Sequence, residues 1–288
     1  MSRPEFIDSV EPLAEAYDLF ILDQWGVLHD GAKAHTGAAE AMAKLKAAGK
    51  TIILVSNSSR RISVSIERLT KLGIAPELYD HILTSGELAW DAIKTQSDPL
   101  YREIGPKCLL IGKDRRADFF DGLALELTDD VGSADLIIVG DLPDSPLDAL
   151  EPMFREAVAR DLTMVVLNPD FHSVDPNGAL TPCPGQVGLA YEALGGKIKT
   201  HGKPNRSVYE VCFQLAPDPE RALAIGDSLH HDIAGANGSA IDSVFITSGI
   251  HVFEMETTPG VTPTQDLVEK VCQKIGQTPT YWSTLFTW

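Results

Sequence analysis

The chain has 288 residues, of which 44% are hydrophobic; this is typical of a globular protein and excludes a disordered one. Its 24 basic and 41 acidic residues give a formal charge of −17, so its field repels nucleic acid and anionic lipid, and we expect neither as a partner. The same field would repel a phosphorylated ligand unless a binding site supplies local cations.

The N-terminal stretch and the cysteines indicate the compartment. MSRPEFIDSVEPLAEAYD is acidic and has no apolar core, and no apolar run approaches the ~20 residues that span a bilayer. We therefore expect a cytoplasmic protein. The cysteines are far apart and form no paired metal-ligand spacing, which indicates idle reduced thiols: Cys108, Cys183, Cys212 and Cys272.

Strand-like and helical segments alternate along the chain, which predicts a doubly wound α/β fold with a parallel sheet. Thr36 is expected to cap a helix that stops at Gly49, Ser85 to start a second helix, and Pro204 to lie in the first turn of a third. The predicted strands are Leu19–Leu22, Thr51–Val55, Cys108–Ile111, Leu136–Val139, Met164–Leu167, Ala222–Ile225 and Ser243–Ile246.

Polar residues follow the outer strands of this series: Asp23, Ser56-Asn57 and Gly226-Asp227. Parallel sheets bind ligands beyond the carboxyl ends of their strands, so these ends are expected to share one crevice. The strands between Cys108 and Leu167 lack such chemistry, apart from Asn-Pro-Asp at 168–170. We therefore predict a core domain from residues 1–82 and 201–288, with a second α/β domain, residues 83–200, inserted into it.

The stretch GDSLHHDIAGA, residues 226–236, offers two carboxylates, Asp227 and Asp232. Together with Asp23 they would form a hard oxygen site of the kind that Mg²⁺ prefers. The alternatives are a helix cap for Asp232 and a loop carboxylate held by backbone amides for Asp227.

Two further stretches suit an anion. LVSNSSR, residues 54–60, ends a strand with hydroxyls and N–H groups before a helix, although an ordinary strand-to-helix turn capped by Ser58 or Ser59 has the same pattern. HGKPNRSVYE, residues 201–210, places Lys203 in a turn. Lys203 is either a solvated surface charge or the local cation that a phosphate needs.

The order strand-Asp, strand-Ser-Asn, Gly-Lys-Pro and strand-Gly-Asp-x4-Asp resembles the haloacid dehalogenase superfamily, whose phosphatases form an aspartyl phosphate on the first Asp. TSGELAW, residues 84–90, and NPDFHSVDPNGALTPCPGQ, residues 168–186, extend the resemblance over nearly the whole chain. They resemble the branch with a type IIA cap, which includes p-nitrophenyl phosphatases and NagD-like phosphatases with a Rossmann-like core.

The resemblance implies roles for individual residues. Asp23 would be the nucleophile and a Mg²⁺ ligand, and the backbone carbonyl of Trp25 a second ligand. Lys203 would neutralise the nucleophile and the phosphoryl group. Asp227 would bind Mg²⁺, and Asp232 would support the metal or orient Lys203. The transferring phosphoryl would be held by Ser56 and Asn57, and the cap would close over the leaving group.

Trp25 departs from the family pattern, because phosphatases of this superfamily carry a second Asp two positions after the nucleophile. That Asp protonates the leaving oxygen and later activates water, which is worth about 10²–10⁴-fold in rate. An indole cannot exchange a proton near neutral pH. Trp25 could pack under the cap or stack on the substrate, and both roles stay open.

The proton could come from another residue, namely His29, Asp30, His230 or His231. Each of these could instead be a solvated loop residue or a supporting contact. Without a substitute, the chain would be a slow phosphatase, a specialist for good leaving groups or a binding protein. Dehalogenation on the same nucleophile is a further option, but Asp227 and Lys203 favour phosphate and Mg²⁺.

We therefore expect a Mg²⁺-dependent hydrolase that acts on a small phosphorylated metabolite. The alternative is a phosphometabolite-binding protein with little or no turnover. In the inserted domain, Asn168, Asp170 and His172 are predicted to contact the substrate or to fix a loop. The aromatic C-terminal stretch YWSTLFTW would pack on the core or form a homodimer contact.

Overall fold

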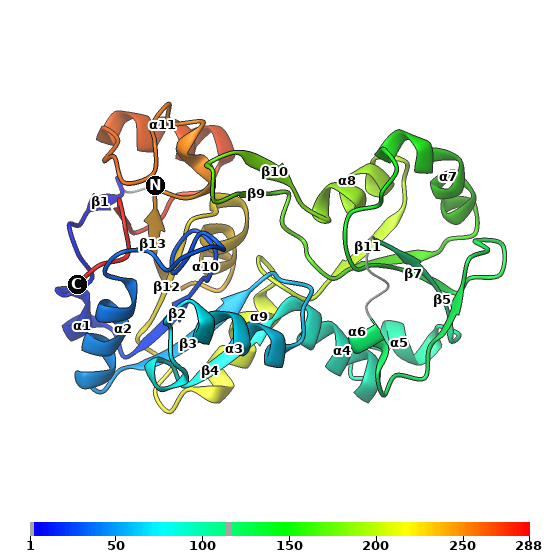
Figure 1. Cartoon of the computed structure of the whole chain (residues 1–288), viewed down its shortest axis with the longest axis horizontal. Coiled ribbons are helices and arrows are strands. Elements are labelled where there is room, and N and C mark those ends of the chain that lie inside the picture. The colour runs from blue at the N-terminus through cyan, green and yellow to red at the C-terminus, as the bar shows by residue number, and fades with distance from the viewer. Residues whose placement is uncertain (1–2, 113–116) are drawn as a thin grey trace.

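A computed structural model describes residues 3–112 and 117–288. They form two parallel sheets and one antiparallel hairpin (Figure 1). The first sheet has the order β1-β14-β13-β12-β2-β3-β4, with bounds β1 (Glu5–Phe6), β2 (Leu19–Leu22), β3 (Thr51–Ser56), β4 (His81–Thr84), β12 (Ala222–Gly226), β13 (Asp242–Ile246) and β14 (Tyr281–Ser283). All of its strand pairs are parallel, which confirms the predicted fold class.

The second sheet lies between β4 and β12 in the sequence and has the order β11-β8-β7-β5-β6, again parallel. Its bounds are β5 (Lys107–Ile111), β6 (Glu126–Thr128), β7 (Leu136–Val139), β8 (Thr163–Val166) and β11 (Lys197–Thr200). The hairpin of β9 (His172–Val174) and β10 (Leu180–Pro182) reaches from this unit towards the first sheet (Figure 1). The boundary expected after residue 82 falls inside β4, whose last two residues pair within the first sheet.

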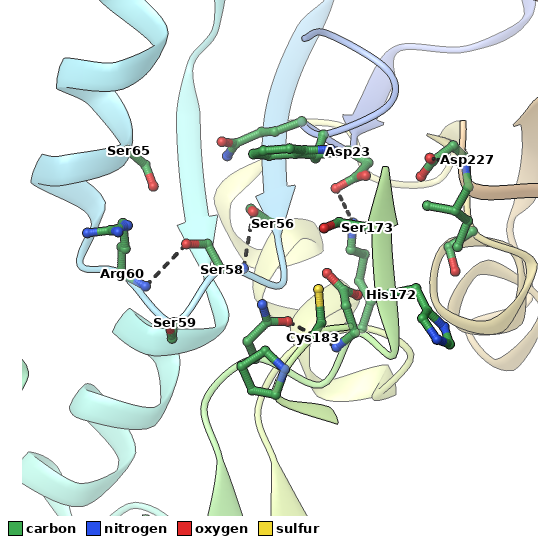
Figure 2. Close-up of a pocket in the computed structure, with 18 of the residues that line it drawn as sticks. Asp23, Ser56, Ser58, Ser59, Arg60, Ser65, His172, Ser173, Cys183 and Asp227 are labelled. Carbon is green, nitrogen blue, oxygen red and sulfur yellow. Dashed lines mark hydrogen bonds and ion pairs between the residues drawn. The ribbon is translucent and has the colours of Figure 1, made fainter. Parts of the chain in front are cut away.

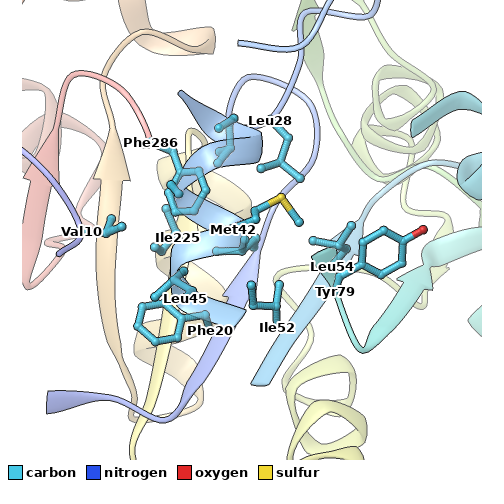
Figure 3. Close-up of a cluster of buried hydrophobic side chains, with 14 of the residues drawn as sticks. Val10, Phe20, Leu28, Met42, Leu45, Ile52, Leu54, Tyr79, Ile225 and Phe286 are labelled. Atoms are coloured by element: carbon cyan, nitrogen blue, oxygen red, sulfur yellow. The ribbon is translucent and has the colours of Figure 1, made fainter. Parts of the chain in front are cut away.

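Helices cover both faces of the first sheet, which explains why β2 is apolar along its whole length. Phe20 and Leu22 pack against Met42 and Leu45 of α2 (Ala38–Ala47), in the cluster of Figure 3. On the opposite face, Leu19 and Ile21 belong to a cluster with residues of α9 (Arg206–Leu215). The strand's period of two therefore sends alternate side chains into two cores.

The remaining helices are α1 (Leu13–Ala16), α3 (Ile62–Lys71), α4 (Ser85–Thr95), α5 (Pro99–Glu103), α6 (Ala117–Phe120), α7 (Glu151–Ala159), α8 (Gly185–Ala193), α10 (Ala234–Gly238) and α11 (Gln265–Ile275). Among the described residues, none of these helices is long and apolar enough to cross a membrane.

Helix starts were predicted less well than strands. The expected cap at Thr36 is wrong: α2 begins after Gly37, whose φ of +86° turns the chain without a side-chain cap. Pro204 precedes α9 rather than lying in its first turn, because Asn205 occupies the cap position. The helix at Ser85 is confirmed, and Thr84 caps it by accepting a hydrogen bond from the N–H of Glu87 (3.1 Å).

The C-terminal aromatic stretch packs on the core. Trp282 lies in β14, and both Trp282 and Phe286 are buried against neighbouring elements of the first unit. All four cysteines are free and buried.

A half-buried histidine at the junction of the two units links stability to pH. His201 follows β11, and its Nε2 lies 2.6 Å from the hydroxyl of Tyr101 in α5. Burial, with a smaller effect from the charge of Lys199, lowers the pKa of His201 to about 4. A histidine in an unfolded chain titrates near 6.5, so between pH 6.5 and 4 the unfolded state binds more protons than the native state.

We predict that His201→Asn flattens the pH dependence of stability. The wild-type free energy of unfolding should fall relative to the variant's by up to about 3 kcal/mol as the pH drops from 6.5 to 4, with its full value above that range. Urea unfolding at several pH values measures the difference. Tyr101→Phe keeps the ring and the burial, so it should lower stability by ~1 kcal/mol without removing the slope. Parallel wild-type and His201→Asn curves would contradict the prediction.

Candidate active site

A group of polar side chains lines a cavity of about 270 Å³ at the carboxyl ends of the first sheet's strands (Figure 2). Asp23 follows β2, Ser56 ends β3 and Asp227 follows β12. The inserted unit closes the opposite side. The lining residues that it contributes include Asp141, Asn168, Asp170, His172, Ser173 and Cys183.

Three buried carboxylates meet in this cavity. Asp23, Asp227 and Asp232 each offer an oxygen within 4.8 Å of the others. Asp232 lies in a π-helical turn, Leu229–Ile233, where its Oδ2 accepts the N–H of Ser228 (3.0 Å). The Oδ2 of Asp227 accepts the N–H of Ile250 (2.9 Å). A backbone N–H thus fixes the side chains of both Asp227 and Asp232, and each of them still has an oxygen within the group.

Gly26 makes room for this group. Its φ is +84°, a conformation that favours glycine, and a Cβ at this position would lie 2.1 Å from Oδ2 of Asp227. Glycine at position 26 is therefore required by the close approach of the carboxylate that follows β12.

Lys203 is the cation at the centre of the group. Its Nζ donates to Oδ1 of Asp23 (2.5 Å) and to the carbonyl of Val55 (2.9 Å), and lies 2.7 Å from Oδ1 of Asp232. The side chain is 3% exposed, so the reading of Lys203 as a solvated surface charge is wrong. Burial alone would lower its pKa, but Asp23 and Asp232 outweigh burial and hold the pKa of Lys203 above its usual value.

One lysine does not balance three carboxylates. Burial and the charge of Asp232 raise the pKa of Asp23, although Lys203 opposes them. Burial together with Asp23 and Asp232 raises the pKa of Asp227 well above its usual range. Excess buried negative charge of this kind fits a divalent cation bound by oxygen ligands. Asp23 and Asp227 are the side chains that could hold such an ion, and the carbonyl of Trp25 lies on the adjoining loop.

Asn57 connects the two units rather than lining the cavity. Its Oδ1 accepts the N–H of Lys203 (2.8 Å), and its Nδ2 donates to the carbonyl of Lys203 (3.0 Å) and to Oδ1 of Asp170 (2.8 Å). Asp170 belongs to the inserted unit, and its N–H donates to Oδ1 of Asn168 (3.0 Å). The Asn57 side chain therefore positions Lys203. Of the residues predicted to bind the phosphoryl group or the substrate, Ser56, Asn168 and Asp170 do line the cavity.

The replacement acids suggested by the sequence are placed differently. Asp30 accepts hydrogen bonds from the N–H groups of Ala32 and Lys33 and does not line the cavity. His230 and His231 line a separate groove with Phe171. The ring of His231 is fixed by Ser228 and by the carbonyl of Pro169, with its Nε2 3.2 Å from that oxygen.

His29 lines the cavity, but it is neutral. Its Nδ1 accepts the N–H of Gly31 (3.1 Å), and burial followed by the charge of Arg68 lowers its pKa to about 4. A neutral imidazole at pH 7 is a poor proton donor. His172, from the inserted unit, is a further cavity histidine among the described residues.

The indole of Trp25 faces the hairpin of the inserted unit. Its Nε1–H donates to the carbonyl of Val174 (2.8 Å), and Arg68 lies over its ring at 4.8 Å from the centroid. The indole therefore packs against the inserted unit, and Trp25 also lines the cavity. Sequence reasoning missed Arg60 and Arg68 as lining residues; Arg60 adjoins the Ser-Asn-Ser-Ser motif, whereas nothing local to Arg68 signalled its position.

Comparison with known proteins identifies the family. A haloacid dehalogenase-like hydrolase model matches residues 20–126, and a HAD-hydrolase-like model matches residues 200–273. The chain belongs to the haloacid dehalogenase superfamily. Among curated relatives of this hydrolase, human chronophin is 28% identical over 252 residues, covering 81% of this chain and 82% of that protein. Mouse glycerol-3-phosphate phosphatase is 27% identical over 267 residues, covering 84% and 82%.

A solved structure matches nearly the whole chain. A haloacid dehalogenase-like hydrolase from Brucella suis 1330 superposes with a TM-score of 0.80 at 26% identity, covering 98% of this chain and 100% of that chain. The match to that structure thus spans both units of this hydrolase, not the first sheet alone.

We predict that Mg²⁺ stabilises the protein through Asp227. Saturating Mg²⁺ should raise the melting temperature of the wild type by several degrees, since a ligand at 100 times its Kd adds about 2.7 kcal/mol. Asp227→Asn should abolish that gain. In EDTA the same variant should be at least as stable as the wild type, because the amide oxygen can still accept from Ile250 while one buried charge is gone.

Thermal melts with and without Mg²⁺ provide the measurement. Asp144→Asn, an exposed carboxylate of the inserted unit, is the control for net charge and should keep the Mg²⁺ response. An unchanged Mg²⁺ response in Asp227→Asn would show that Asp227 is not a metal ligand.

Proposed function

We propose that this hydrolase is a Mg²⁺-dependent phosphatase of small phosphorylated metabolites, with Asp23 as its nucleophile. The observation that carries the proposal is the buried group of Asp23, Asp227 and Asp232 around the Nζ of Lys203. A net negative, water-poor group of this composition suits a dication and a phosphoryl dianion together. The names of the curated relatives, phosphatases among them, support the same reaction class.

In the first step an oxygen of Asp23 attacks phosphorus, and the bond from phosphorus to the leaving oxygen breaks. Oδ1 of Asp23 is held by Lys203, and Oδ2 makes no hydrogen bond to the described part of the chain, so it is the free nucleophilic oxygen. Lys203 lies next to both reactants and offsets their mutual repulsion. When bound, the metal supplies further charge neutralisation between the carboxylate and the phosphoryl oxygens.

The second step hydrolyses the acyl phosphate. Water attacks phosphorus, the bond to Asp23 breaks, and inorganic phosphate leaves. The hydroxyl of Ser56, at the end of β3, is the side-chain donor for the phosphoryl oxygens, together with backbone N–H groups of the loop that follows. Asn57 serves by fixing the backbone of Lys203, and Asn168 and Asp170 border the leaving group from the inserted unit, residues 83–200, acting as a cap.

The leaving oxygen receives no proton from Trp25. The indole N–H is already donated to Val174, and an indole does not titrate near neutral pH. We therefore propose a phosphatase specialised for leaving groups that depart without protonation, such as phenols or carboxylates. The same observation favours one second candidate, a phosphometabolite-binding protein with little turnover.

The direct test is a panel of phosphate esters with Mg²⁺, with Asp23→Asn as the inactive variant. A beryllofluoride complex should form on Asp23 in the wild type and should not form in Asp23→Asn. Phosphate and Mg²⁺ binding without turnover of any ester would establish the binding protein instead.

We predict a steep dependence of turnover on the leaving group's pKa. 4-Nitrophenyl phosphate or an acyl phosphate should be cleaved far faster than glycerol phosphate. Trp25→Asp restores a carboxylic acid and should raise the rate on alkyl phosphates by about 10-fold or more, below the full 10²–10⁴ because the contact with Val174 is lost. The rate on 4-nitrophenyl phosphate should change little.

Trp25→Phe is the matched control, because it also loses the hydrogen bond to Val174 but gains no acid. It should lack the gain on alkyl phosphates. A flat leaving-group dependence in the wild type would mean that another group, such as His172, already protonates the leaving oxygen.

A further inference from the structure

Two arginines that line the cavity have no carboxylate partner among the residues that the structure describes. Arg60 and Arg68 both border it, and neither forms an ion pair with the described residues, 3–112 and 117–288. Their neighbour Arg61, in contrast, binds Glu87 with two hydrogen bonds of 2.7 and 2.8 Å. In a chain with 41 acidic residues and 24 basic ones, free cations in a cavity indicate a site for an anion.

Arg68 is held in place by contacts that leave its charge unneutralised. Its guanidinium lies over the Trp25 ring at 4.8 Å, and Nη2 donates to the carbonyl of Gly31 (3.2 Å). Gly31 has φ +92°, and a Cβ there would lie 2.3 Å from the Trp25 ring and 2.9 Å from Nη2 of Arg68. Gly31 therefore has to be a glycine for the indole and the guanidinium to pack against this turn.

The two arginines also repel each other. Burial first, and then the positive charge of Arg60, lowers the pKa of Arg68. A pair of like charges at the wall of a cavity is unfavourable by itself and becomes favourable when an anion bridges it. The buried residues Ser59 and Ser65 lie on the same part of the wall and add small polar side chains to it.

The part of the cavity wall that carries Arg60 lies away from the carboxylate group. Figure 2 shows Ser58, Arg60 and Ser65 on one side of the cavity and Asp227 on the other, with Ser56 between them. A phosphoryl group on Asp23 and Ser56 would direct its leaving group into the space between this wall and the inserted unit. Arg60 is then placed to meet the far end of the substrate and not the transferring phosphoryl, and Arg68 is near enough for its charge to interact with that of Arg60.

We infer that Arg60 and Arg68 bind a second anionic group on the leaving group of the substrate, so that the substrate class is phosphate esters that also carry a carboxylate or a second phosphate. This inference rests on the proposed phosphatase function for the position of the first phosphoryl. Guanidinium groups suit both oxyanions, because their planar N–H pairs match carboxylate and phosphate oxygens. Trp25 is a positioning residue in this scheme, since it supports Arg68.

The test uses non-hydrolysable probes, so it does not depend on turnover. Calorimetry with Mg²⁺ compares (4-carboxybenzyl)phosphonate with its neutral isostere (4-carbamoylbenzyl)phosphonate and with 1,4-xylylenediphosphonate. The wild type should bind a probe with a second anionic group roughly 10- to 100-fold more tightly than the probe whose second group is an uncharged carboxamide. This is the range expected for charge-assisted hydrogen bonds. The stronger of the two anionic probes identifies a carboxylate or a phosphate as the second group.

Variants assign that preference to the wall. Arg68→Met and Arg60→Met should each remove most of it, and Arg60→Met does so without disturbing the Trp25 stack. Lys71→Met removes one exposed charge from α3, the helix that carries Arg68, at a position outside the cavity. This variant should keep the full preference. The inference would be overturned by equal affinity for probes with and without the second anionic group. It would also be overturned by a preference that survives in both arginine variants.

Turnover is measured separately with the corresponding aryl phosphates. Hydrolysis of all of them, without preference among the phosphonates, would leave the phosphatase intact and the anion site wrong. A strong preference among the phosphonates, without hydrolysis of any ester, would leave the anion site intact and the phosphatase wrong.

Discussion

The position of one buried ammonium group organises the active site. The Nζ of Lys203 lies against Asp23, Asp232 and the carbonyl of Val55, and it has almost no contact with solvent. A buried cation requires such partners, and buried carboxylates require such a cation. The first sheet meets that requirement because β2, β3 and β12 end at the same edge. The excess charge that remains after this pairing makes a metal ion an expected companion of the group.

Sequence reasoning predicted the features that depend on short stretches of the chain. A buried strand followed by Asp23, and another followed by Gly-Asp-x4-Asp, locate carboxylates at the sheet edge whatever surrounds them. The alternation of strands and helices likewise predicted a parallel sheet and an inserted α/β domain. These features depend on strand period and on parallel topology, and both can be inferred from short windows of sequence.

Other features depend on contacts between distant segments. The amide of Asn57 was expected on a phosphoryl group, yet it holds the backbone of Lys203, which lies 146 residues away. The Trp25 indole meets a carbonyl 149 residues away, and Arg68 reaches the cavity only because α3 presents that side chain towards Trp25. No local pattern encodes such pairings.

The hydrogen bond from Asn57 to Asp170 has a consequence for modular exchange between relatives. Asp170 is a residue of the inserted unit, but its partner fixes the main chain around the central lysine of the first unit. The inserted unit therefore helps to hold Lys203 in place, in addition to lining the opposite side of the cavity. A chimera that took residues 83–200 from a relative would have to bring a matching carboxylate at this point, or the recipient's lysine turn would lose one of its supports. Exchange of the inserted unit between such proteins is thus constrained by the side chain at position 170 as well as by the two connections to the first unit.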